Sequence, residues 1–489
     1  MSNVYLCTAI PYVNGNPHIG HAMDYLLADT YARYRRLIGQ PGDEVRFSAG
    51  TDEHGNKVFH SAKKAGMSVE DYSKQNSDKF RAFINKMGVT YTDFIRTTDE
   101  DHIRRCQEIW QKLTPHIYSA EYDGWYCEGC ESFVTQKECD ENHGICPDHQ
   151  KPYEHLTEKN YYLRISDFKD EIARKIERDE MQILPEFRKN EALKLLADAP
   201  DISISRPRSH LSWGIPVPGD EDQVMYVWMD ALPNYITVLG YPDQDISAWW
   251  PATAQFIGKD IVRFHTIIWP AILLGLGLPL PERLVTHGHI LANGQKMSKS
   301  LGNVVDPVEV MDRHGLDAFR YFFLSHVDTF LDSDFTWEKF DAAYNNELAN
   351  DLGNLVQRLA TLCRKNEVMS NPDHQLSLND YRASDPEYFA LMDRFEFTKA
   401  FAYVWQKVQS INKTIDEKKP WELAKQGKTD EVKQVLSAIV QQLDDANHLL
   451  MPLIPDATAK IQQILHPDSA VPAPIVPPET PLFPKTRPE

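Results

Sequence analysis

The N-terminal stretch of this chain reads as a strand, a tight turn and a helix, and it constrains the fold more than any other part of the sequence. The apolar run Val4 to Ile10 leads through a turn rich in Pro, Asn and Gly into the helix-patterned stretch Ala22 to Ile38. Strand-like and helix-like stretches continue to alternate up to about residue 115. This alternation predicts a parallel sheet, and such sheets bind ligands at the carboxyl ends of their strands.

The turn carries two histidines and a glycine at the start of the predicted helix. A helix N-terminus offers unpaired N–H groups and a partial positive charge to phosphate, and Gly20 lets a flat ligand approach the backbone. His18 and His21 lie one turn apart, so both imidazoles can donate to the oxygens of a phosphorus centre that gains charge. A helix cap, a surface pair and two metal ligands are the alternatives that the His-x-x-His spacing leaves open.

A basic motif occurs late in the same predicted domain, where Lys296-Met-Ser-Lys299-Ser follows the strand-like stretch Leu284 to Ile290. A flexible loop with two lysines can bring ammonium charges onto a triphosphate, although a basic loop alone is usually solvated surface. The early His-Ile-Gly-His and the late Lys-Met-Ser-Lys-Ser together resemble the paired signature of the class I aminoacyl-tRNA synthetases. Their spacing and flanking residues are similar to those of the methionyl-tRNA synthetases.

The resemblance implies an ATP-dependent methionine–tRNA ligase. Such an enzyme converts L-methionine and ATP, with Mg²⁺ on the nucleotide, to methionyl-adenylate and pyrophosphate, and then transfers methionine to the 3′-terminal adenosine of tRNA(Met). The methionine carboxylate is already a nucleophile, so catalysis requires alignment and charge stabilisation rather than a general base. A class I synthetase for another amino acid and an inactive paralogue that only binds tRNA are the alternatives. The catalytic residues implied are His18, His21, Lys296 and Lys299.

Other residues suit the nucleotide. Gly258 permits close approach and Asp260 is an acid suited to ribose, while His289 would lie beside adenine or the α-phosphate. The ATP site implied by the resemblance consists of His18, Gly20, His21, Gly258, Asp260, His289 and Lys299.

The resemblance also implies a methionine site. Asp52, in Gly50-Thr-Asp-Glu-His-Gly55, is expected near the amino group, and a helix cap at Thr51 or Asp52 is the alternative that the sequence itself offers. Periodicity alone would place the aromatic members of the side-chain pocket in the core. A thioether is favoured at aromatic edges, and the Tyr235 hydroxyl near the sulfur would help to reject competitors such as homocysteine. The residues implied for the side-chain pocket are Ile10, Tyr12, Trp228, Tyr235, Ile261, His265 and Trp269.

A cysteine-rich segment interrupts the alternation. Cys127-Glu-Gly-Cys130 is followed after fifteen residues by Cys146-Pro-Asp-His149, a spacing typical of structural zinc. Cys139 could replace His149 and give four thiolates, but His149 completes the second half of the motif. Four protein ligands leave no open position, so one Zn²⁺ per chain is expected to stabilise the insertion rather than to do chemistry.

Only helical periodicity remains in residues 341–467, which predicts a helix bundle. The periodicity does not distinguish an RNA-binding bundle from a dimerisation module. The resemblance implies that Asn354, Arg358 and Trp421 recognise a CAU anticodon, since splayed bases are read by stacking and edge hydrogen bonds. The proline-rich residues 468–489 predict an extended strap or a disordered end.

The expected fold class is therefore α/β, a Rossmann-type parallel sheet split by a zinc-knuckle insertion and followed by an all-α bundle. The expected boundaries are 1–115 and 225–305 for the two halves of the catalytic domain, 116–224 for the insertion, 306–340 for a stem-contact connecting segment, 341–467 for the anticodon-binding bundle and 468–489 for the tail.

Composition fits a folded soluble protein, with 42% hydrophobic and 25% charged residues and neither a signal peptide nor a membrane-spanning run. Seven cysteines, four of them in one segment, favour metal in a reducing cytosol and hence a cytoplasmic location. The net charge of −19 requires basic residues to gather locally if tRNA is to bind. A monomer is expected because the chain ends without the additional C-terminal domain that some relatives carry.

Overall fold

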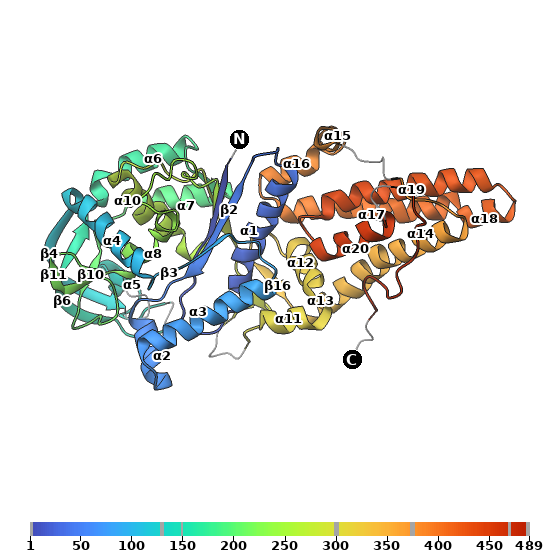
Figure 1. Ribbon diagram of the computed structural model, residues 1–489. Helices are drawn as coiled ribbons and strands as arrows, with labels where there is room; N and C mark the ends of the chain where they lie inside the picture. Colours follow the sequence, from blue (N-terminus) through green and yellow to red (C-terminus); the bar gives the residue numbers. More distant parts are fainter. Residues whose placement is uncertain are drawn as a thin grey trace. The chain divides into compact units, whose positions relative to one another are not determined.

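The computed structural model describes residues 3–127, 132–147, 150–297, 303–371, 377–467 and 471–485 (Figure 1). The chain forms two compact units. The first comprises Met1–Pro17 and Gly42–Thr286, and the second comprises His18–Pro41 and His287–Glu489.

A six-stranded sheet of order β3-β2-β1-β12-β13-β7 is the centre of the first unit. Strand β1 is parallel to β2 and β12, β2 is parallel to β3, and β13 is parallel to β7. Every residue of β1 is buried, as expected for a central parallel strand that is covered on both faces. The structure thus confirms the predicted α/β sheet, whose strands are β1 (Val4–Thr8), β2 (Val45–Thr51), β3 (Asp93–Arg96), β7 (Gln182–Leu184), β12 (Ala254–Gly258) and β13 (Arg283–His287).

Strand β7 belongs to the segment in which the sequence predicted an interruption of the alternation. It pairs with β13 at the edge of the main sheet, with Ile183 opposite Leu284. Three residues are too few for a periodic pattern to show, which is why the sequence did not predict this strand.

The same segment builds two antiparallel sheets. The larger has the order β5-β4-β6-β8, and its long β4–β6 ladder runs from Ile117 opposite Leu163 to Tyr126 opposite Glu154. The smaller has the order β10-β11-β9. Cys127 is the last residue of β4, so the cysteine motif begins at the far end of the long ladder. The strands are β4 (Ile117–Cys127), β5 (Ser132–Val134), β6 (Glu154–Leu163), β8 (Ile202–Ser203), β9 (Ser205–Pro207), β10 (Pro216–Val217) and β11 (Asp220–Met225).

Helices complete the first unit. Helix α4 packs against α8, α9 and α10, and a π-helix over Phe264–Ile268 leads directly into α10. These helices and the main sheet share one hydrophobic core that includes Trp110, Tyr235 and Trp269. The helices are α2 (Asn56–Ala65), α3 (Val69–Lys86), α4 (Glu100–Leu113), α5 (Gln136–Glu141), α6 (Lys169–Glu177), α7 (Glu186–Ala197), α8 (Val227–Ala231), α9 (Asn234–Thr237) and α10 (Trp269–Gly275).

The second unit is mostly helical. Helices α14, α17, α19 and α20 pack together as the predicted C-terminal bundle, which Figure 1 shows in orange and red. A small sheet of order β15-β14-β16 lies in the same unit. None of the helices in the described ranges is long and apolar enough to cross a membrane. The elements are α1 (Ile19–Ile38), β14 (Ile290–Ala292), β15 (Gln295–Lys296), α11 (Pro307–His314), α12 (Leu316–Ser325), β16 (Ser333–Phe335), α13 (Trp337–Ala343), a π-helix (Tyr344–Gly353), α14 (Asn354–Lys365), α15 (Leu378–Ser384), α16 (Pro386–Asp393), α17 (Phe397–Lys418), α18 (Pro420–Lys425), α19 (Thr429–Leu450) and α20 (Pro455–Leu465).

The described part of the tail, residues 471–485, packs against the helices of the second unit. Ile475 and Phe483 are buried, and the Tyr344 hydroxyl donates to the Pro484 carbonyl at 2.8 Å. Of the two alternatives left by the sequence, this part of the tail is therefore an extended strap.

Candidate active site

Two stacked imidazoles form the first turn of α1. The rings of His18 and His21 have centroids 3.6 Å apart and planes inclined by 22°. Nδ1 of His18 accepts from the Gly20 N–H at 3.1 Å, and Nδ1 of His21 accepts from the His18 N–H at 3.2 Å. The pair therefore caps the helix, which was one of the alternatives open at the level of sequence.

This cap determines which ring nitrogen carries the proton. Because each Nδ1 accepts from a backbone N–H, the proton of a neutral ring lies on Nε2. Both rings consequently have an Nε2–H donor, the group needed to stabilise a phosphate oxygen that gains charge. Capping and phosphate binding are thus compatible roles for His18 and His21. Gly20 keeps the turn compact, since a Cβ at that position would lie 3.0 Å from Cε1 of His18.

The segment His287-Gly288-His289 is tied to the same helix. Nε2 of His287 lies 3.0 Å from Oδ1 of Asp24, which is on α1. Gly288 has no room for a side chain, because its Cβ would come within 2.3 Å of the Leu331 carbonyl group. His289, one of the residues predicted to bind the nucleotide, follows this constrained glycine, and it is partly exposed.

The lysine motif begins at the small sheet of the second unit. Lys296 is the last residue of β15, where its backbone pairs with Leu291 of β14. Lys299 lies outside the described residues. The sequence prediction for the two lysine side chains therefore stays a prediction.

Four of the residues predicted for the methionine pocket lie together in the first unit. The ring of Tyr235 lies 5.8 Å from that of His265 and 5.6 Å from that of Trp269, centroid to centroid. Trp228 meets His265 edge to face at 6.2 Å. The sequence did not single out Phe264, which stacks on Trp228 at 3.9 Å with an angle of 13° between the planes.

His265 is buried and held by hydrogen bonds on both sides of its ring. Nδ1 lies 3.0 Å from the Ile261 carbonyl, which can only accept, so the proton is on Nδ1. Burial lowers the pKa of His265 from 6.5 to about 4, so the ring is neutral at pH 7 and Nε2 is an acceptor. The Tyr235 hydroxyl therefore donates to Nε2, at 2.8 Å. The π-helix and the start of α10, which follows it, thus bring the rings of His265 and Trp269 next to the ring of Tyr235.

Asp52 and Tyr12 form a parallel bridge after the ends of β1 and β2. The Asp52 N–H donates to the Pro11 carbonyl at 2.9 Å, and the Val13 N–H donates to the Asp52 carbonyl at 3.1 Å. The helix-cap alternative for Asp52 is wrong, because α2 has Gly55 as its N-cap and no side-chain cap.

Other residues predicted for the methionine and ATP sites lie at or just after the ends of strands. Ile10 lies beside Gly50, where a Cβ would approach the isoleucine Cγ2 to 3.1 Å. Gly258 ends β12, and Asp260 is exposed in the 3₁₀ turn Lys259–Ile261 that follows.

Three cysteines of the predicted zinc segment share one small hydrophobic cluster. Cys127, Cys139 and Cys146 are at most 4% exposed, and Tyr153 packs with them. Cys130 and His149 lie outside the described residues. One cysteine of each predicted knuckle half, Cys127 and Cys146, thus lies in this cluster, and Cys139 lies there too.

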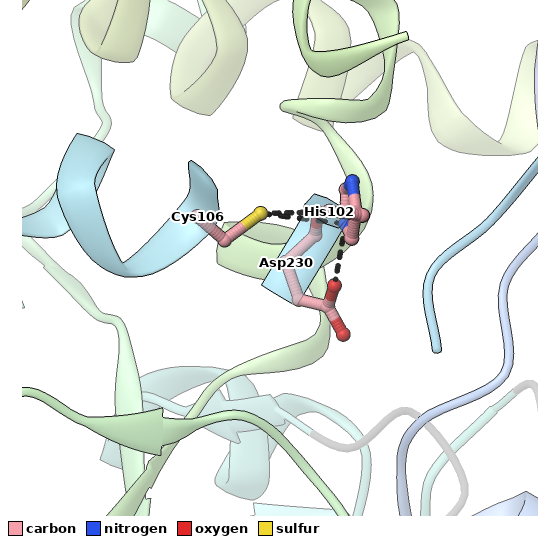
Figure 2. Close-up of side chains that lie close together, drawn as sticks. All are labelled: His102, Cys106 and Asp230. Atoms are coloured by element: carbon pink, nitrogen blue, oxygen red, sulfur yellow. Dashed lines mark hydrogen bonds and ion pairs between the residues drawn. The ribbon is translucent and has the colours of Figure 1, made fainter. Parts of the chain in front are cut away.

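A buried polar network that the sequence did not predict lies between α4 and α8 (Figure 2). In the described ranges, only His102, Cys106 and Asp230 bring three possible ligand atoms within 4.8 Å of one another. His102 and Cys106 share a face of α4 because they are four residues apart. That spacing was the only signal available in the sequence, and nothing there pointed to Asp230.

Two of the residues predicted for RNA binding meet in the bundle. The Arg358 guanidinium of α14 lies over the ring of Trp421 of α18, 5.1 Å from its centroid. Arg358 also pairs with Asp416 at 2.6 Å. Asn354 is exposed one turn before Arg358.

Comparison with known proteins gives concordant results. A family model described as tRNA synthetases class I (M) matches residues 4–155 and 148–360. The methionine–tRNA ligase of Thermotoga maritima is 36% identical over 94% of this chain and 74% of its own length. That of Caldanaerobacter subterraneus is 40% identical over 94% of this chain and 73% of its own length. The structure of Mycobacterium tuberculosis methionyl-tRNA synthetase in complex with methionyl-adenylate superimposes with a TM-score of 0.87 at 32% identity, covering 99% of this chain and 100% of that one.

Proposed function

The chain belongs to the methionyl-tRNA synthetases of class I, and we propose that it binds the phosphates of ATP at the turn that starts α1. It is a methionine–tRNA ligase, which activates methionine with ATP and transfers it to tRNA(Met). One observation carries the proposal for the turn. Both His18 and His21 use Nδ1 to cap the helix, so that Nε2–H of each ring is a donor for phosphate.

In the first step a methionine carboxylate oxygen attacks the α-phosphorus, and the bond from that phosphorus to the bridging oxygen of pyrophosphate breaks. The oxygens of the α-phosphate gain charge as the new bond forms, and we propose that the Nε2–H groups of His18 and His21 stabilise this charge. Mg²⁺ bound with ATP supplies charge neutralisation on the departing pyrophosphate. Lys296 and Lys299 are proposed to add ammonium charge to the same phosphates.

The proposed methionine site lies in the first unit. Asp52 is proposed to hold the amino group, because an ammonium is recognised by a nearby carboxylate. The aromatic set of Trp228, Tyr235, His265 and Trp269 suits a polarizable thioether. The neutral state of His265 supports this assignment, since a charged ring would disfavour an apolar side chain.

Further roles are proposed from the family resemblance. Gly258 and Asp260 are proposed to contact the ribose, and His289 the adenine or α-phosphate. Residues 306–340 are proposed as the stem-contact segment and 341–467 as the anticodon-binding domain, in which Asn354, Arg358 and Trp421 read the anticodon. A cytoplasmic location is part of the same proposal.

We also propose that one structural zinc is held by Cys127, Cys130, Cys146 and His149. The buried cluster of Cys127, Cys139 and Cys146 supports a metal here, because thiols in a segment this rich in Asp, Glu and Asn have little other reason to be buried together. Zinc at this position would stabilise the end of the β4–β6 ladder.

The phosphate roles are tested by methionine-dependent exchange of pyrophosphate into ATP, which does not require tRNA. Lys299→Ala should slow exchange by about 100-fold and leave equilibrium binding of methionine within about twofold, since the ammonium acts on the transition state. Lys413→Ala, at an exposed lysine of the bundle that pairs with Glu417, is the control and should leave exchange unchanged. Unchanged exchange in the Lys299 variant would show that the assigned role is wrong.

A further inference from the structure

The carboxylate of Asp230 is almost fully buried and is shared by two histidines from different segments. Its side chain is 1% exposed. Oδ2 lies 2.6 Å from Nδ1 of His54, and Oδ1 lies 3.0 Å from Nε2 of His102. Figure 2 shows the second of these contacts. One carboxylate on α8 thus joins the loop after β2 to helix α4.

Each of the three segments that meet here carries or contacts a part of the proposed methionine site. His54 is two residues after Asp52, and Trp228 is two residues before Asp230 on α8. Nδ1 of His102 lies 2.8 Å from the Thr237 hydroxyl, and Thr237 is two residues after Tyr235 on α9.

The loop that carries Asp52 has other side-chain contacts as well. The carboxylate of Glu53 accepts hydrogen bonds from the Arg96 guanidinium at 2.8 and 2.7 Å and from the Thr98 hydroxyl at 2.7 Å. The Trp213 indole donates to the Glu53 carbonyl at 2.6 Å, and the Gly55 N–H donates to the Trp213 carbonyl at 3.0 Å. None of these contacts leads to α8 or α9. The link through Asp230 joins the loop that carries Asp52 directly to α8, and through His102 and Thr237 it reaches α9.

The network is electrostatically consistent with a carboxylate held by two donors. Burial by itself would raise the pKa of Asp230, but His54 and His102 together keep that pKa below its usual range. Burial raises the pKa of Cys106, so the thiol stays protonated, and its Sγ donates to the Asp230 carbonyl at 3.8 Å. A protonated thiol is a poor metal ligand, which favours a hydrogen-bonded network over a second metal site.

We propose that Asp230 is a positioning residue for methionine recognition, which holds Asp52 at the correct distance from Trp228 and Tyr235 through its hydrogen bonds to His54 and His102. The inference rests on the proposed methionine site. In this proposal Asp230 does not contact the substrate. Weakening its hydrogen bonds is expected to let Asp52 move relative to Trp228 and Tyr235, and to leave the phosphate-binding turn at the start of α1 unchanged.

Asp230→Asn tests the proposal, because an amide of the same shape can accept from only one of the two histidines. The Michaelis constant for methionine in pyrophosphate exchange should rise about tenfold, as expected for binding groups held loosely, while that for ATP changes less than about twofold. Asp444→Asn is the matched control, since Asp444 is also a buried carboxylate bonded to a histidine, His466 at 3.0 Å, but lies in the bundle. It should leave both constants unchanged.

A second pair of variants keeps the proposal testable if Asp230→Asn fails to fold. His54 bonds through Nδ1, so His54→Asn can reproduce the donor and should stay close to wild type, whereas His54→Ala should raise the methionine constant as Asp230→Asn does. A merely structural role would instead lower the melting temperature and affect both substrates equally. Equal changes in the two constants, or no change in that for methionine, would overturn the inference.

Asp52→Asn separates this failure from a failure of the proposed site. If Asp52→Asn weakens methionine binding and Asp230→Asn does not, only the positioning role of Asp230 is wrong. If neither variant alters methionine binding, the proposed location of the methionine site is wrong as well.

Discussion

The hydroxyl of Tyr235 donates a 2.8 Å hydrogen bond to Nε2 of His265, and both residues are buried. The donor of this hydroxyl is already used, so toward a substrate the oxygen can offer only a lone pair. The backbone of Tyr235 is held as well, since its carbonyl accepts from the Tyr5 hydroxyl at 2.9 Å.

Tyr235→Phe should leave Nε2 of His265 buried without its donor. The expected loss is about 1 to 3 kcal/mol of unfolding free energy, measured by urea denaturation. The preference for methionine over homocysteine in pyrophosphate exchange should fall in the same variant. Tyr91→Phe removes a hydroxyl whose bond to Asn85 is exposed, and it should change stability by less than about 0.5 kcal/mol. Equal losses of unfolding free energy in Tyr235→Phe and Tyr91→Phe would contradict the conclusion that His265 depends on the Tyr235 hydroxyl as its buried donor.

His265 should make stability depend on pH in a specific window. Its pKa is about 4 in the folded protein and 6.5 ordinarily, so between these values the unfolded chain binds a proton that the folded chain does not. Stability should therefore fall as the pH drops from 6.5 toward 4, by about 3 kcal/mol from this group, and the contribution should be constant below pH 4. Comparing urea denaturation of wild type and His265→Gln at several pH values isolates this component. If the unfolding free energy depends on pH in the same way in wild type and His265→Gln, the pKa of His265 is not lowered in the folded protein.

Arg320 should be essential for the stability of the second unit. It is 1% exposed, it pairs with Asp29 at 2.7 Å, and it donates to the carbonyls of Pro452 and Leu453 at 2.9 and 2.8 Å. Arg320→Ala leaves a carboxylate and two carbonyls buried without this partner, so the expected loss is about 3 to 5 kcal/mol in denaturant unfolding.

The exposed Arg313, which pairs with Asp341, provides the comparison for Arg320. Arg313→Ala should cost no more than about 1 kcal/mol. A small effect of Arg320→Ala would mean that the α1, α12 and α20 contacts hold the unit together without the ion pair.

Trp421→Ala should impair tRNA charging and spare amino acid activation. Loss of one stacked base is worth about 1 to 3 kcal/mol, so kcat/KM for tRNA(Met) should fall by roughly 10- to 100-fold while pyrophosphate exchange stays unchanged. Trp249 is a suitable control because an arginine, Arg46, lies over its ring too, 5.7 Å from the centroid, in the first unit. If Trp249→Ala impairs charging as much as Trp421→Ala, stacking on the anticodon is not the reason for the loss.

The zinc ligands can be assigned by metal content. Purified wild type should contain about one zinc per chain, and Cys127→Ser or Cys146→Ser should abolish it, because three remaining ligands bind structural zinc weakly. Cys139→Ser should retain the metal. Retention in His149→Ala together with loss in Cys139→Ser would instead identify four thiolates as the site.

Much of this architecture follows from local patterns in the sequence. The strands β1 and β13, helix α1 and the helical character of the C-terminal bundle were predicted because their hydrophobic patterns show in the local sequence. The resemblance implied Arg358 and Trp421 as anticodon residues but not a contact between them, and in the structure the Arg358 guanidinium lies over the Trp421 ring.

Other features depend on tertiary contacts that no local pattern carries. The role of Asp230 needs His54 and His102, which are 176 and 128 residues away in sequence. Phe264 gains its stacking on Trp228 from a π-helix, whose wider turn shifts side chains away from the α-helical spacing. The capping role of His18 and His21 was an open alternative, because hydrogen-bond partners decide it rather than spacing.

Strand β7 has a consequence for how the inserted segment can be altered. The segment cannot be excised as a detachable module, because deletion would strip Gln182–Leu184 from β13 and leave backbone groups of a buried strand facing solvent. A shortened enzyme is expected to fold after truncation of the cysteine-bearing end of the segment only if strand β7 is kept. The cysteine-bearing end of the segment is thus less constrained than the three residues of β7, which are paired with the main sheet.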